Sequence, residues 1–154
     1  MQKAWSDRIL VKAMASNDVE AVVDLEKQVF SPWNKSLIKS ELKYASSIAL
    51  VVKTAGELAG WCCCRYENTE AELLKMTVAE KWRRRSVATR LLNALESRLR
   101  AMSVESLYLE VRAKNVPATT FYNQAGFTVT GRRINYYSQP NDHALILQKL
   151  LYDH

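Results

Sequence analysis

The spacing of hydrophobic positions changes along the chain between the rhythm typical of strands and the rhythm typical of helices. Apolar residues first predict a short strand at 9–14. Helical spacing then predicts two helices, at 17–29 and 36–44, which are separated because Pro32 cannot continue a helix. Asn17 and Glu20 have the spacing of a capping box, so the first of these helices should begin there.

Three strand-like runs follow at 47–53, 58–66 and 71–78. The turns between them are short and polar, which favours hairpins between neighbouring strands. An antiparallel meander is therefore predicted for this part of the chain.

The pattern becomes helical again after residue 86, where Val87, Leu91, Leu95, Leu99 and Met102 recur on one side of an amphipathic helix. The remaining elements expected are a strand at 107–112, a helix at 115–125 and closing strands at 127–137 and 144–151. Strand, helix, strand after a meander is an α/β arrangement, in which the long helix crosses between parallel neighbours.

Composition narrows the class of protein. The chain has 154 residues, of which 48% are hydrophobic and 25% charged, as expected for one globular domain. No apolar run approaches the length of a membrane span, and the start of the chain lacks the apolar centre of a signal peptide. We therefore expect a cytoplasmic protein without a membrane partner.

The three cysteines are consecutive, at 62–64, within a predicted strand. Neighbouring side chains of a strand point to opposite faces, so these residues fit neither an unstrained disulfide nor a tetrahedral metal site. Free buried thiols and no bound metal are predicted.

The stretch at 81–92, KWRRRSVATRLL, combines arginines with a tryptophan, as nucleic-acid-binding surfaces do, in a chain of net charge +6. It runs without a break into the long helix. The first amides of a helix lack internal partners, and the helix dipole favours a negative charge there. A phosphate or pyrophosphate therefore fits this helix start better than a duplex, although a merely solvated helix start remains an alternative.

Three segments, MTVAEKWRRRSVATRLL, LYLEVRAKNVPATTFYNQAGF and RRINYY, resemble the GNAT family of acetyl-CoA-dependent N-acetyltransferases. The resemblance extends from about residue 9 to 150 and includes an FSPW element at 30–33. The LEVR strand, the N-to-FY spacing and the YY pair are most similar to RimI-type protein N-terminal acetyltransferases. The resemblance implies one GNAT domain over 1–154, with a mixed central sheet flanked by helices. This sheet would join the antiparallel N-terminal meander to a parallel pair around the cofactor helix.

The resemblance also implies how acetyl-CoA is held. The family signature at 83–88 has glycine where this chain has Ser86, and glycine there lets backbone amides approach phosphates without a Cβ in the way. We expect a weaker cofactor affinity, and a non-catalytic homologue is left open. The residues implied are Met76, Thr77 and Val78 along the pantetheine arm, Arg84, Arg85, Ser86, Val87, Ala88 and Thr89 around the pyrophosphate, Arg83 beside it, and Asn115 further along.

Two residues are candidates for proton transfer. Glu110 shares one strand face with Tyr108 and Arg112, and a mid-strand carboxylate is costly to bury without a purpose or a partner. The pattern alone leaves open a general base or a salt bridge from Glu110 to Arg112 or another arginine. The resemblance implies that Glu110 is the general base, acting through water, and that Tyr122 is the general acid. An ordinary packing role is the alternative for Tyr122.

By the same resemblance, Tyr136, Tyr137 and Trp33 would line the acceptor groove, although aromatic residues in such places often only pack. His143 stands where the family usually has an acidic residue, which puts the acceptor in doubt. The implied reaction is direct attack, in a ternary complex, by a protein N-terminal amine, implied to be the N-terminal alanine of small-subunit ribosomal protein eighteen. Alternatives are a small-amine acetyltransferase, a non-catalytic CoA-binding protein and a nucleic-acid-binding module.

Overall fold

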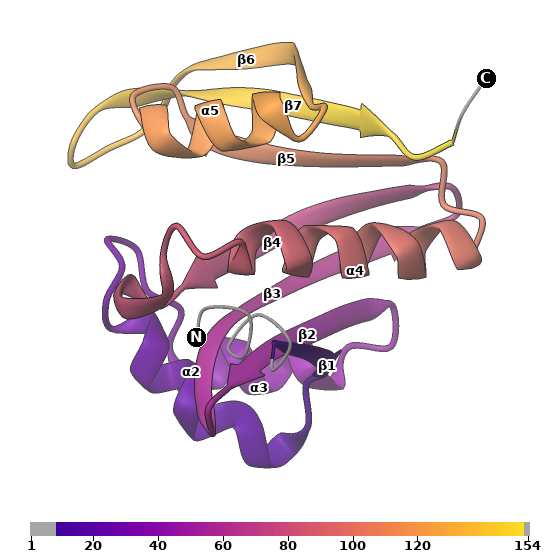
Figure 1. The fold of residues 1–154 in the computed structure, drawn as a ribbon. Helices are drawn as coiled ribbons and strands as arrows, with labels where there is room; N and C mark the ends of the chain where they lie inside the picture. Colours follow the sequence, from indigo (N-terminus) through magenta and orange to yellow (C-terminus); the bar gives the residue numbers. More distant parts are fainter. Residues whose placement is uncertain (1–8, 153–154) are drawn as a thin grey trace.

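The computed structural model describes residues 9–152, which form a seven-stranded mixed sheet with helices on both faces (Figure 1). The strands are β1 (Leu10–Ala13), β2 (Ser47–Thr54), β3 (Glu57–Glu67), β4 (Glu70–Val78), β5 (Ser106–Arg112), β6 (Thr128–Tyr137) and β7 (Asp142–Leu150). The helices are α2 (Val19–Glu26), α3 (Lys35–Lys43), α4 (Val87–Ala101) and α5 (Val116–Gln124), with short 3-10 helices η1 (Ser16–Asp18) and η2 (Glu80–Trp82). None of the helices in this part of the chain is long and apolar enough to cross a membrane.

The sheet order is β1-β2-β3-β4-β5-β7-β6, and the predicted meander β2-β3-β4 is confirmed as antiparallel. The turn between β2 and β3 holds Ala55 and Gly56 at φ of 51° and 77°. Positive φ at both central residues matches the twist of a two-residue hairpin. The predicted order of elements after the meander is also confirmed.

The parallel pair is the feature that shapes the rest of the molecule. β4 pairs with β5 only from Glu70 to Glu72, opposite Ser106 to Tyr108. Beyond these residues β4 continues to Val78 and β5 to Arg112 without a shared ladder, and the two strands part (Figure 1). The sheet is therefore open at the carboxyl ends of its two parallel strands.

The two faces of the sheet carry different helices. Trp61 donates its indole N–H to Glu26 of α2, so the next residue on β3, Cys62, points to the opposite face, where α4 packs. Gly60 lies on that α4 face, and a Cβ there would come within 3.2 Å of Val87 and Leu91. The absence of a side chain at this position lets α4 lie directly on the strand.

The cysteines are buried free thiols. Burial raises the pKa of the Cys62 and Cys63 thiols far above the ordinary value, and it raises the pKa of Cys64 to about 12. These side chains therefore stay protonated and serve as small apolar groups in the core.

The predicted capping box is wrong. The chain enters α2 through η1, and the Asp18 carboxylate accepts a hydrogen bond from the Ala15 amide (2.8 Å) while it pairs with Lys53 (2.7 Å). Glu20 forms an ion pair with Lys35 instead of capping. Because Lys53 on β2 pairs with Asp18, the residue that accepts from the Ala15 amide is Asp18, one residue after the predicted cap Asn17. The helix α2 ends at Glu26, before the predicted end at 29.

Candidate active site

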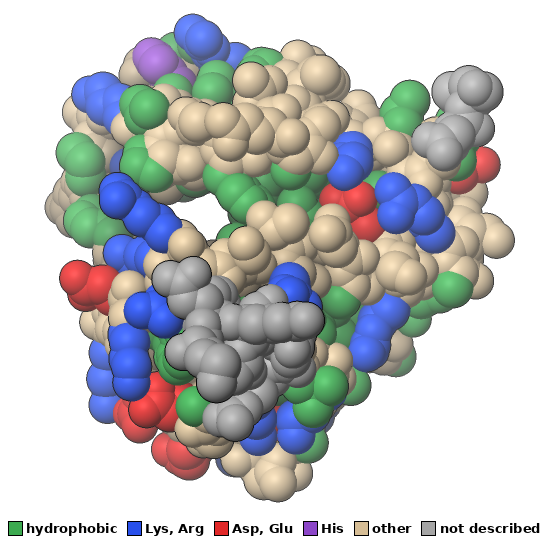
Figure 2. Space-filling model, in the orientation of Figure 1, with side chains coloured by type: hydrophobic (Ala, Val, Ile, Leu, Met, Phe, Trp, Pro, Cys, Tyr) green, Lys and Arg blue, Asp and Glu red, His purple; other side chains and the backbone are tan. Residues whose placement is uncertain are grey.

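Two adjoining hollows follow the line along which β4 and β5 separate. One of about 350 Å³ is lined by the loop after α2, both strands, α5 and the end of β6. The other, of about 340 Å³, lies at the start of α4 and is closed by Phe121 of α5. Figure 2 shows the surface hollowed between α4 and α5, with Lys and Arg side chains at the edge.

The opening in the sheet lets side chains from both faces meet. Glu110 lies on the sheet face that α3 covers. Tyr108, two residues earlier on the same strand, pairs with Glu72, and Glu72 pairs with Arg65, so these side chains share one face. Arg65 binds Glu41 of α3, which identifies that face. Tyr122 comes from α5, which lies on the same side as α4 (Figure 1). Both residues line the 350 Å³ hollow. Side chains from both sides of the sheet therefore reach one hollow.

The start of α4 has the geometry of an anion cradle. Arg84 and Ser86 have φ of 62° and 65°, and Ser86 precedes the helix without making a side-chain cap. The unpaired amides of the first helical turn are thus left for a ligand. The lining includes Val78, Arg83, Arg84, Ser86, Val87, Ala88 and Thr89, all of them predicted cofactor residues.

One predicted cofactor residue is turned aside from this cradle. The Arg85 guanidinium lies over the Trp82 ring, 5.3 Å from its centroid, and Arg85 is not among the residues that line either hollow. Met76, Thr77 and Asn115 line the larger hollow. The Asn115 side chain also caps α5, because its oxygen accepts from the Ala118 amide at 3.2 Å.

Tyr122 is held in an apolar setting. Its ring packs edge-on against Phe121 and Phe127, at centroid distances of 5.2 and 5.4 Å. Burial, with a smaller effect of Cys62, raises the pKa of the Tyr122 phenol well above its ordinary value of 10. The hydroxyl therefore keeps its proton at neutral pH, as a proton donor must.

Glu110 forms a salt bridge with an arginine, which was one of the two alternatives that the sequence pattern left open. It also lines the hollow. The partner is Arg133 of β6, whose Nε lies 3.2 Å from Glu110 Oε1. Arg112 instead donates to the Pro140 carbonyl at 2.8 Å and lies over the Tyr137 ring at 4.3 Å.

The three aromatic residues expected in the acceptor groove are placed differently from one another. Tyr137 lines the larger hollow, whereas Tyr136 is exposed beside it. Trp33 packs edge-on against Trp61 at 5.8 Å and is not brought to the hollow. Phe30, from the same FSPW element as Trp33, lines the hollow in its place.

Two carboxylates that support the site were not singled out from the sequence. Glu26 is fully buried and accepts hydrogen bonds from the Trp33 amide, Trp61 Nε1 and Thr77 Oγ1. Asp142 accepts from the amides of Lys114 and His143. An acidic residue within the apolar stripe of α2 was a signal for Glu26, but the contacts of Asp142 depend on chain segments far apart in sequence.

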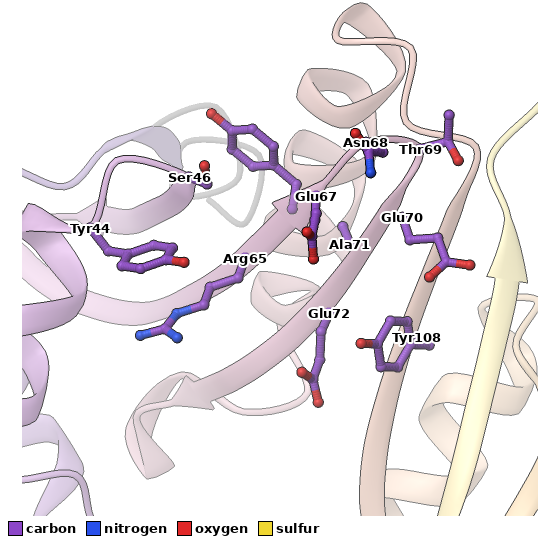
Figure 3. Close-up of a pocket in the computed structure, with 11 residues that line it drawn as sticks. Tyr44, Ser46, Arg65, Glu67, Asn68, Thr69, Glu70, Ala71, Glu72 and Tyr108 are labelled. Atoms are coloured by element: carbon purple, nitrogen blue, oxygen red, sulfur yellow. The ribbon is translucent and has the colours of Figure 1, made fainter.

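A larger hollow, about 760 Å³, lies at the other end of the β4–β5 seam (Figure 3). Glu72 and Tyr108 stand side by side there on neighbouring strands. Arg65 donates hydrogen bonds to the Glu41 carboxylate, and its guanidinium lies 4.0 Å from the Tyr44 ring centroid. This hollow contains neither the cradle nor Glu110, so size does not mark the reaction centre.

Within residues 9–152, no three His, Cys, Asp or Glu side chains are grouped so that they could hold a metal ion. An anion cradle, a carboxylate and a protonated phenol thus lie along the line where the parallel pair opens.

The chain belongs to the acetyltransferase (GNAT) family, which matches residues 19–127. A Bacillus subtilis protein, named provisionally as a ribosomal protein bS18-alanine N-acetyltransferase, is 30% identical over 141 residues, covering 89% of this chain and 92% of the relative. The enzyme of that name from Haemophilus ducreyi is 26% identical over 133 residues, covering 86% and 91%. The crystal structure of the ribosomal-protein-S18-alanine N-acetyltransferase from Escherichia coli superposes with a TM-score of 0.88 at 23% identity, covering 95% and 96%.

The resemblance to RimI-type enzymes and the GNAT fold are thereby confirmed. The protein is an N-acetyltransferase, and acetyl-CoA is its acetyl donor.

Proposed function

We propose that this enzyme acetylates the α-amine of a protein N-terminus, namely the N-terminal alanine of ribosomal protein bS18, in the cytoplasm. The names of the relatives from Bacillus subtilis and Haemophilus ducreyi support this acceptor. The observation that carries the proposal is the meeting of Glu110 and Tyr122 in one hollow that adjoins the cradle at the start of α4.

The residues of the cradle fit the donor. The first-turn amides of α4, with Arg83 and Arg84 beside them, would hold the pyrophosphate, and Ser86 offers a hydroxyl in place of the family's glycine. Arg85 would act from its place on Trp82 as a flanking charge. Met76, Thr77 and Val78 would line the pantetheine arm where β4 has lost its partner strand, and Asn115 would touch the cofactor further along. Bound acetyl-CoA supplies an acetyl group activated as a thioester.

Glu110 and Tyr122 would move the two protons of the reaction. An N-terminal ammonium must lose a proton before its nitrogen can attack, and the Glu110 carboxylate accepts it, directly or through water. Tyr122 holds a proton on its buried hydroxyl and can donate it to the departing sulfur. Both transfers would take place in the hollow that these two residues line.

The acceptor would enter past Tyr137 and Phe30, which face the hollow from β6 and from the loop after α2. The Arg112 guanidinium lies over both rings, 4.3 and 5.4 Å from their centroids. Tyr136 would extend this wall at the surface, because its ring packs against Tyr137 at 5.1 Å. Trp33 would contribute from behind, by holding the FSPW loop to Trp61 and Glu26.

Acetyl transfer from labelled acetyl-CoA to a synthetic peptide with the bS18 N-terminus, followed by mass spectrometry, tests this function. We expect one acetyl group on the α-amine and none on a peptide whose α-amine is already blocked. Glu110→Gln and Tyr122→Phe should each reduce kcat by about 10²-fold with little change in stability. Transfer to spermidine at a rate equal to or above that of the peptide would identify a small-amine enzyme and reject this acceptor.

A further inference from the structure

Arg133 belongs to the RRINYY segment, but neither a cofactor-binding nor a catalytic role has been assigned to it. It lies on β6, which is separated from β5 by β7. Arg133 pairs with Ala144, and Ala144 pairs with Arg112, so the Arg133 side chain lies on the Glu110 face and reaches across β7. Its Nε stands 3.2 Å from Glu110 Oε1.

The other charged and titratable groups around Glu110 make this contact significant. Burial and the nearby Glu110 charge raise the pKa of Glu72 on β4, while Arg133 opposes that rise. Burial and Glu110 likewise raise the pKa of Tyr137. Burial, with the charges of Glu72, Glu70 and Glu110, raises the pKa of Tyr108.

Arg112, two residues from Glu110, donates instead to the Pro140 carbonyl. Arg133 is thus the cation that the structure pairs with a carboxylate set among acidic neighbours.

The ion pair between Arg133 and Glu110 can also open. The Arg133 side chain is 53% exposed and the Glu110 side chain 20% exposed, so water can reach both. The register between β6 and β7 is irregular from Arg133 to Tyr137, with Asn135 at φ of 53°. Ion pairs between partly exposed groups are weak, so the guanidinium can leave at little cost.

We propose that Arg133 is a positioning residue that occupies the Glu110 carboxylate in the resting site and yields it to the ammonium of the acceptor. This proposal rests on the proposed role of Glu110 as the base. The guanidinium holds the Glu110 carboxylate until a second cation, the acceptor amine, takes its place. After transfer the nitrogen is an uncharged amide, which cannot compete with a guanidinium for the carboxylate. Once Glu110 has passed the proton it accepted to water, Arg133 returns to the carboxylate and favours release of the acetylated product.

The KM for an alanine pentapeptide that has a free N-terminus tests the first half of this cycle. In Arg133→Ala the acceptor ammonium no longer has to displace a guanidinium from Glu110. We expect KM about two- to fivefold below that of the unmodified enzyme, because an ion pair between partly exposed groups is weak. Arg133→Lys, which keeps the cation, should restore KM. Arg132→Ala is the matched control, because it removes the same charge from the other face of β6.

Inhibition by the N-acetylated pentapeptide tests the second half. Without Arg133 the product meets no competing cation, so we expect it to inhibit Arg133→Ala about threefold more tightly than the unmodified enzyme or Arg132→Ala. Equal inhibition of all three proteins would overturn the product-release role.

A readout without turnover separates this inference from the proposed function. The affinity for the pentapeptide in the absence of acetyl-CoA, measured by calorimetry, should be about two- to fivefold higher in Arg133→Ala than in the unmodified protein or in Arg133→Lys. Equal affinities would overturn the role of Arg133 even if the enzyme is active. Undiminished transfer by Glu110→Gln would instead reject Glu110 as the base and leave the binding result standing. Thermal unfolding midpoints of all variants establish that each is folded.

Discussion

Glu26 joins three parts of the chain that must stay together for the acceptor wall to exist. Its carboxylate receives hydrogen bonds from the Trp33 amide and Thr77 Oγ1 at 2.9 and 2.7 Å, and Lys75 Nζ lies 3.4 Å away. Glu26→Ala would leave these donors and a lysine charge without their acceptor. We expect a loss of about 3–5 kcal/mol of unfolding free energy, measured by urea denaturation.

The same helix supplies the control for that experiment. Glu20→Ala removes an exposed carboxylate that pairs with Lys35, and exposed pairs contribute about 0–1 kcal/mol. A loss in Glu26→Ala no larger than in Glu20→Ala would contradict the structural role assigned to Glu26.

Ser86 is a second single residue with a measurable effect, because its φ of 65° is one that glycine adopts more easily. Relief of the left-handed conformation in Ser86→Gly should add about 1 kcal/mol of unfolding free energy. We also expect tighter acetyl-CoA binding by calorimetry, since no Cβ then stands between the amides and the phosphates.

Ser103 provides a matched control at the far end of α4. It has a φ of 64°, and Ser103→Gly should give a similar gain in stability. It should leave acetyl-CoA affinity unchanged. If both glycine variants bind acetyl-CoA equally, the cradle at the start of α4 is not where the pyrophosphate sits.

At the scale of elements, Asp142 ties the start of β7 to the turn between β5 and α5. Burial alone would raise the pKa of Asp142, but the amides of Lys114 and His143 hold it below the ordinary value of 3.8. Because the folded-state pKa is the lower one, this tie stabilises the fold fully above about pH 4 and is lost as the pH falls through the folded-state pKa. Asp142→Asn should therefore unfold at a lower temperature than the unmodified protein at pH 7. The difference should shrink steadily below pH 3.8 in calorimetric scans.

The elements themselves were predictable because their signals are local. Hydrophobic spacing and short turns predicted the meander, α4 and the strand of Glu110, each within a few residues of its observed ends. The cap of α2 was mispredicted because Lys53, on β2, draws Asp18 into an ion pair. The partners of Glu26 and Glu110 lie 7 to 51 residues away, so their contacts depend on the folded sheet and leave no pattern in the sequence.

At the scale of the whole molecule, the net charge of +6 is compatible with two kinds of anionic partner, and the opened sheet distinguishes between them. The basic residues at the start of α4 stand over a hollow of about 340 Å³, which suits a small phosphate-bearing ligand. Contacts with a nucleic-acid duplex would instead need charges spread along an exposed surface.

Ligand-induced stabilisation therefore gives a test of the assembled site. In the proposed site acetyl-CoA would bind only where β4, β5 and α4 are folded together, so at about 100 times its Kd it should add about 2.7 kcal/mol to the unfolding free energy. For a chain of this size we expect the thermal midpoint to rise by about 5–10 °C. Pantetheine, which lacks the pyrophosphate, should raise it much less, because it cannot use the amides of the first turn of α4. An equal rise with pantetheine would show that the cradle at the start of α4 is not part of the binding site. A rise with a DNA duplex that disappears in high salt, without any rise with acetyl-CoA, would mean that the basic helix start binds nucleic acid.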